Sequence, residues 1–69
     1  MEKQYVVYLN GTIIVATDDY NEAKESFDKQ VKNWQEHYKD KVIENDDVLT
    51  LFDYYNQIVI SRFCKLDLL

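Results

Sequence analysis

Two runs of apolar, mostly β-branched residues lie on either side of Asn10-Gly11 near the start of the chain. An Asn-Gly pair readily adopts the two positive-φ conformations of a type I′ turn, so residues 5–9 and 12–16 are predicted to form a β-hairpin. Pairing Leu9 with Thr12 and alternating strictly gives two faces, and both are apolar. One face carries Tyr5, Val7, Leu9, Thr12, Ile14 and Ala16, and the other carries Val6, Tyr8, Ile13 and Val15.

An apolar stripe at helical period follows in residues 20–39. Its members recur every three or four positions, as one face of an amphipathic helix requires. Asp19 precedes the stripe and Glu22 follows three positions later, which is the spacing of a capping box. The pattern predicts one helix about 30 Å long. The stripe consists of Tyr20, Ala23, Phe27, Val31, Trp34 and Tyr38.

Two further strands are predicted at residues 48–53 and 58–66, joined around residues 54–57. This turn has no glycine, so its register stays open, although loops of two or four residues give the same alternation. One predicted face holds Leu49, Leu51, Ile58, Ile60, Arg62 and Cys64, and the other holds Val48, Thr50, Phe52, Val59, Ser61 and Phe63.

Together these elements predict one α+β domain over residues 1–69, with the order ββαββ. Its four strands form an antiparallel sheet, and one long amphipathic helix packs on one face of that sheet. The strand order and the face that the helix covers stay open at this stage.

A helix covers only one face of such a sheet, so a second apolar face predicts a binding partner. A 69-residue domain buries only about 60% of its unfolded surface, and the single cysteine excludes an internal disulfide. We therefore expect a homodimer that also binds another protein. The expected partner-binding residues are Tyr8, Ile13, Val15, Tyr54 and Tyr55, with Glu44, Asp46 and Asp47 as acidic contacts.

The charge and composition of the chain indicate which partners it can bind and in which cellular compartment it works. A net charge of −5 argues against direct nucleic-acid binding, which needs a basic surface. No apolar run approaches the length of a membrane helix or of a signal peptide, and a lone cysteine is typical of a reducing compartment. The expectation is a cytoplasmic protein that stays out of the membrane.

No constellation of residues indicates catalysis, so we expect a protein that is not an enzyme and needs no cofactor or metal. The acidic segment 44–47 lacks the alternating ligands, glycine and final glutamate of an EF-hand. It is a solvated loop, a divalent-cation site or a contact for a basic partner. His37 has no nucleophile at an informative spacing. Cys64 resembles a small buried hydrophobic residue. Arg62 could pair with an anionic ligand or with Asp53 on the neighbouring strand, and the cross-strand pair is the simpler account.

Mimicry of DNA by the acidic residues is a weaker hypothesis. Five lysines lie among the six acids between residues 19 and 41, so the helix has almost no net charge. The remaining acidic patches, one at each end of the helix, stand about 30 Å apart. That spacing does not reproduce a continuous row of phosphates.

The composition is rich in Asp, Asn, Lys, Tyr and Ile, with one glycine and no proline. In this style, though in no single motif, the chain resembles the small acidic early proteins of bacteriophages that infect low-GC bacteria. Many of those proteins inhibit host or defence proteins. The resemblance implies a phage-encoded inhibitor that acts in the bacterial cytoplasm by occluding its target. Two alternatives stay open: a small-ligand sponge with a pocket at an oligomer interface, using Tyr8, Tyr55 and Arg62, and a structural or assembly protein.

Overall fold

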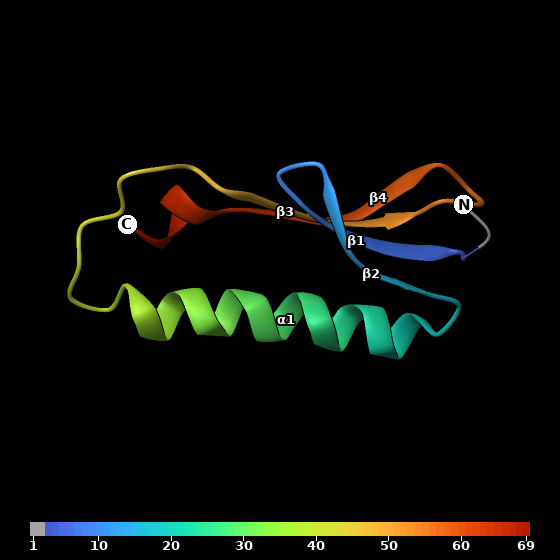
Figure 1. Cartoon of the computed structure of the whole chain (residues 1–69), viewed down its shortest axis with the longest axis horizontal. Helices are drawn as coiled ribbons and strands as arrows, with labels where there is room; N and C mark the ends of the chain where they lie inside the picture. Colours follow the sequence, from blue (N-terminus) through green and yellow to red (C-terminus); the bar gives the residue numbers. More distant parts are fainter. Residues whose placement is uncertain (1–2) are drawn as a thin grey trace.

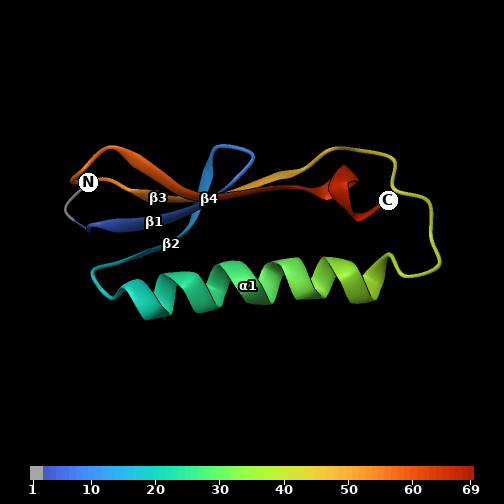
Figure 2. The ribbon, with the colours of Figure 1, turned by 180° about the vertical axis from the view of Figure 1, so that it is seen from behind.

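A computed structural model describes residues 3–69 of the chain. The four strands form one antiparallel sheet in the order β2-β1-β3-β4, and the helix runs alongside it as a second layer (Figure 1 and, from behind, Figure 2). The predicted α+β class and the order ββαββ are confirmed. The elements are β1 (Tyr5–Leu9), β2 (Thr12–Thr17), α1 (Tyr20–His37), β3 (Val48–Asp53), β4 (Ile58–Cys64) and a short 3-10 helix η1 (Lys65–Leu68).

The first hairpin turns at Asn10-Gly11. Both residues have positive φ, 51° and 82°, as a type I′ turn requires. Asn10 also fixes the neighbouring strand, since its backbone N–H donates to the Val48 carbonyl and its side-chain oxygen accepts from the Val48 N–H, each at 2.9 Å. The turn is thereby attached to the first residue of β3, which lies beside β1 in the sheet.

A bulge in β2 changes the predicted register of the first hairpin. Val7 stands opposite Val15 and Tyr8 stands opposite Ile13, which leaves Ile14 as the extra residue. A bulge exchanges the faces of all residues beyond it. Val15 therefore packs toward the core with Val7, and the prediction that it shares a face with Tyr8 and Ile13 is wrong.

A second bulge, in β4, changes the other hairpin in the same way. The four-residue loop brings Phe52 opposite Val59, as expected, but Leu51 then pairs with Ser61 and Ile60 is the extra residue. Phe63 and Ile60 pack toward the core. Arg62 and Cys64 consequently stand opposite Thr50 and Val48 on the outer face. The prediction that they share a face with Leu49 and Leu51 is wrong.

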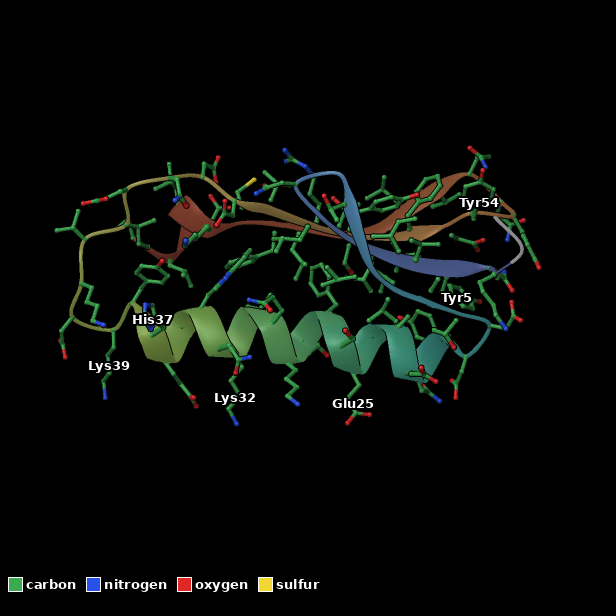
Figure 3. The ribbon with its side chains drawn as sticks, viewed as in Figure 1. Tyr5, Glu25, Lys32, His37, Lys39 and Tyr54 are labelled. Atoms are coloured by element: carbon green, nitrogen blue, oxygen red, sulfur yellow. The ribbon has the colours of Figure 1, made fainter. Side chains whose placement is uncertain are left out.

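The core lies between the sheet and α1. Its buried side chains belong to one cluster that also draws in the half-buried Val31, Tyr38 and Phe63. The Asp19 carboxylate caps the helix by accepting from the N–H groups of Asn21 and Glu22. The helix side chains labelled Glu25 and Lys32 in Figure 3 point away from the sheet, and so does Lys39 just after the helix. The core cluster consists of Val7, Ala23, Phe27, Trp34, Leu49 and Leu51.

None of the helices within residues 3–69 is long and apolar enough to cross a membrane.

Candidate functional site

The sheet face opposite α1 exposes less apolar surface than the strand pattern suggests. Val6 lies on this outer face between Ala16 and Phe52, yet it is fully buried. Tyr8 is half-buried, and Val15 lies on the core side because of the bulge in β2. The exposed apolar side chains of the strands instead lie on the two outermost strands, β2 and β4.

An aromatic row crosses the outer face. The Tyr8 and Phe52 rings lie 6.4 Å apart at an interplanar angle of 63°, and the Phe52 and Tyr54 rings lie 6.2 Å apart at 88°. Such edge-to-face contacts are the favoured geometry of aromatic pairs. Tyr8 and Tyr54, two predicted partner-binding residues, are thus joined through one ring. Phe52 was not among the expected site residues, although its alternation with the buried Leu51 places it on the same face.

The turn between β3 and β4 gathers exposed apolar residues at one end of the molecule. Two tyrosines of the turn and the first two residues of β4, which alternate between the faces of the sheet, are between 36% and 59% exposed. Figure 3 places Tyr54 at the end of the molecule away from His37. We call this set the turn surface, and it consists of Tyr54, Tyr55, Ile58 and Val59.

The buried carboxylate of Asp53 holds this turn in place. Its Oδ1 accepts from the backbone N–H groups of Tyr55 and Asn56, each at 3.1 Å, and its Oδ2 accepts from the Asn56 side chain at 2.8 Å. The Gln4 side chain lies 3.4 Å from both oxygens. These bonds favour the ionised form, so the pKa of Asp53 is lowered, with the Asn56 side chain as the largest cause. The turn surface is therefore carried by an ordered backbone.

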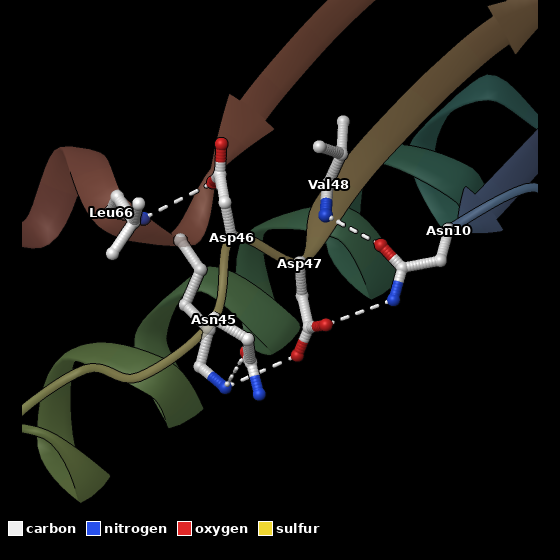
Figure 4. A network of polar contacts seen from close by, with 7 residues as sticks. Asn10, Asn45, Asp46, Asp47, Val48 and Leu66 are labelled. Carbon is white, nitrogen blue, oxygen red and sulfur yellow. Dashed lines mark hydrogen bonds and ion pairs between the residues drawn. The ribbon is translucent and has the colours of Figure 1, made fainter.

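The predicted acidic contacts lie at the other end of β3. Asp47 accepts from the Asn10 side chain at 2.9 Å and from Lys65 Nζ at 3.1 Å, and Asp46 accepts from the Leu66 N–H at 3.3 Å (Figure 4). The pKa of Asp47 is lowered, first by the Asn10 hydrogen bond and then by Lys65. Glu44 and Asp46 are exposed, whereas Asp47 is half-buried.

The structure therefore does not bring all of the expected site residues together. The length of β3 separates Asp46 and Asp47 from Tyr54 and Tyr55. Ile13 stands opposite Tyr8 on the edge strand β2, at the far side of the sheet from β4. The expected residues therefore lie in three places: the turn surface, the edge of β2 with Ile13, and the acidic segment before β3. Tyr8 lies between the first two, because it pairs with Ile13 and its ring contacts Phe52.

Lys65 is a buried residue that the sequence pattern did not single out. Its ammonium lies 3.0 Å from Asn45 Oδ1 and 3.1 Å from Asp47 Oδ2, over the rings of Tyr38 at 4.4 Å and Trp34 at 5.8 Å. The pKa of Lys65 is raised, chiefly by its hydrogen bond to Tyr38 and next by Asp47. A lone lysine among apolar residues has no local signature that reveals such burial. Its partners come from segments far apart in the sequence.

The remaining candidate residues have ordinary surroundings. His37 is exposed, and its ring lies edge-to-face with the Tyr38 ring, with the two centroids 4.7 Å apart. Cys64 is half-buried on the outer face. The predicted pair between Arg62 and Asp53 is wrong, because Arg62 stands opposite Thr50 while Asp53 lies on the other side of the sheet.

Within residues 3–69, no group of three or more side chains is suited to hold a metal ion, and no pocket opens between the elements. Comparisons with protein-family models, with curated proteins and with solved structures found no match. The function is therefore inferred from the surfaces of this chain itself.

Proposed function

We propose that this chain is a non-enzymatic protein-binding module that contacts its partner through the turn surface. The observation that carries the proposal is a run of four exposed large side chains at the β3–β4 turn: Tyr54 and Tyr55 lie in the turn itself, and Ile58 and Val59 are the first two residues of β4. Tyrosine is enriched among interface residues that dominate binding energy, because it offers a large rigid area with a polar tip. The Asp53 hydrogen bonds support the idea further, since an ordered turn loses less conformational entropy on binding.

The kind of partner follows from charge and composition. A net charge of −5 favours a target with a basic surface, and it would speed their encounter. In this proposal the chain is a phage-encoded inhibitor that works in the bacterial cytoplasm by occluding a host or defence protein. It does so as a homodimer, with α1 as an amphipathic helix packed on one sheet face. The burial of Ala23, Phe27 and Trp34 supports that packing.

Quantitative affinity capture from a lysate of a low-GC bacterium tests the proposal with two matched variants. Val59→Lys places a charge on the turn surface, whereas Val42→Lys makes the same change at a more exposed position in the loop after α1. We expect one protein to be captured by the wild type and by Val42→Lys, and to be lost with Val59→Lys. Burying an unpaired lysine in an apolar contact accounts for the loss.

Three results would contradict the proposal. One is repeated capture of no protein by the wild type. Another is a captured protein that Val59→Lys retains in full while circular dichroism shows both variants folded. The third is equal loss of the partner with Val42→Lys, which would mean that added positive charge disrupts binding wherever it is placed.

A further inference from the structure

We propose that two copies of this chain associate by antiparallel pairing of their β2 strands, which joins two four-stranded sheets into one continuous sheet. The inference rests on the proposed function, which includes a homodimer, and it names the strand that forms the dimer.

The edge of β2 is open to such pairing. In the sheet order β2-β1-β3-β4, this strand pairs with β1 on one side, and no described strand lies beyond it. Natural proteins usually protect an open edge with lysines, proline or inward-pointing charges, because its unpaired backbone groups invite another strand. Residues 12–17 contain no charged residue, no proline and no glycine. The opposite edge strand, β4, carries the exposed Arg62.

The bulge adds apolar surface to the same edge. Because Ile14 is the extra residue of β2, it does not alternate into the core, and both Ile13 and Ile14 are 42% exposed. Two consecutive isoleucines in this state cost free energy in water, and a second apolar strand would cover them. Bulges can also protect an edge, but β4 has one as well, so the bulge does not distinguish the two edges.

The absence of charged residues in β2 makes this strand the place where two copies of the acidic chain can meet. Two chains of net charge −5 repel each other wherever acidic surfaces meet, and β2 is a strand on which they can meet without that repulsion. Antiparallel pairing centred between Ile14 and Val15 sets Ile13 beside Ala16 of the other copy. In the same register Asp18 falls beside Gly11 of the other copy, so the acidic flanks do not face each other. A strand that pairs with itself about a two-fold axis forms a closed, self-complementary interface.

Light scattering coupled to size-exclusion chromatography tests the dimer at micromolar concentration. We expect twice the mass of one chain for the wild type and the mass of one chain for Ile14→Lys. Ile58→Lys is the matched control, since it makes the same change at a comparably exposed isoleucine on the opposite edge strand. That variant should remain a dimer. A monomeric wild type, a dimeric Ile14→Lys variant, or loss of the dimer with Ile58→Lys alone would overturn the inference.

Crosslinking keeps the inference testable if Ile14→Lys fails to fold. In a Cys64→Ser background, Ile14→Cys should yield disulfide-linked dimers on mild oxidation, whereas Ile58→Cys should not, and the reverse pattern would overturn the inference. Partner capture separates the two proposals, because Ile58→Lys should lose the captured protein and keep the dimer. Ile14→Lys should keep the captured protein and lose the dimer. A dimer that captures nothing therefore contradicts the proposed function alone, and a monomer that still captures its target contradicts the dimer alone.

Discussion

The ammonium of Lys65 lies 4.4 Å from the centre of the Tyr38 ring. This contact holds the start of η1 against the C-terminal end of α1, and Asp47 completes it at 3.1 Å from the same ammonium. Because Asp47 also accepts from Asn10, one carboxylate links the first hairpin turn, the loop after α1 and the C-terminal segment. Charge-assisted hydrogen bonds therefore join these three segments, which are far apart in the sequence.

This arrangement predicts how stability depends on pH in acid. The pKa values of Asp47 and Asp53 are lowered in the folded chain, so the unfolded chain binds more protons between those values and the ordinary aspartate pKa of about 3.9. Their contribution is fully present above about pH 4 and is lost as pH falls through the lowered values. Urea unfolding as a function of pH checks this. Asp47→Asn should show a shallower decline in acid than the wild type, and an unchanged decline would contradict it.

The same linkage has the opposite sign for Lys65, whose pKa is raised in the folded chain. Its contribution is fully present below the ordinary lysine pKa of about 10.4 and is lost as pH rises through the raised value. Thermal unfolding at alkaline pH should therefore show a loss of stability that Lys65→Met lacks. Methionine keeps the packing against Trp34 and Tyr38 but carries no charge. Parallel alkaline declines for the two proteins would contradict the prediction.

Truncating the buried aromatic residues of α1 should unfold the domain. Phe27→Ala or Trp34→Ala removes a side chain from the core cluster, and such changes cost about 3–5 kcal/mol. Chemical denaturation followed by circular dichroism measures the loss. Glu25→Ala, on the helix face that points away from the sheet, should stay within about 0.5 kcal/mol of the wild type. Wild-type melting of either aromatic variant would mean that α1 does not pack on the sheet as described.

Gly11→Val should destabilise the first hairpin through the backbone alone. The φ of Gly11 is 82°, which a β-branched residue resists, while a Cβ at this position would meet no atom within 4 Å. We expect a loss of about 1–2 kcal/mol in thermal or urea unfolding. Gly11→Asn is the control, since asparagine tolerates positive φ, and it should retain most of the stability. Equal losses of stability in the two variants would contradict the claim that the positive φ of Gly11 causes the loss.

Local patterns predicted the elements well and their faces less well. Asn10-Gly11 has the expected turn conformation, Asp19 begins the helix, and residues 48–53 form the predicted strand. The predicted helix over residues 20–39 ends earlier, at His37. The faces beyond Ile14 and Ile60 were wrong because a bulge inserts one residue without a glycine or other local signal at either position.

The candidate site was predictable only in part, because some of its contacts join residues that are far apart in the sequence. Tyr54 and Tyr55 could be expected on a turn from their position between two strands, and they are exposed there. The predicted strand over residues 48–53 already separates Asp46 and Asp47 from these tyrosines. The contact of Tyr8 with Phe52, by contrast, depends on how the two hairpins join in the sheet. That joining rests on contacts such as Asn10 with Val48, which are distant in the sequence.

Removing the Asp53 carboxylate should loosen the turn surface without removing any of its side chains. In Asp53→Ala, the N–H groups of Tyr55 and Asn56 lose their acceptor, so their hydrogen exchange should become faster. The N–H groups in the middle of α1 serve as the internal reference and should exchange as before. Unchanged exchange at residues 55 and 56 would mean that Asp53 does not order the turn.

Hydrogen exchange of the chain, alone and bound to the protein that it captures, tests the proposed function most directly. Binding through the turn surface predicts slower exchange in residues 54–59 and no change in the middle of α1, whose outer side chains point away from the sheet. The same protection should disappear with Val59→Lys and persist with Val42→Lys. Protection confined to α1 or to the acidic residues 44–47, with none in residues 54–59, would contradict the proposal that the turn surface is the binding site.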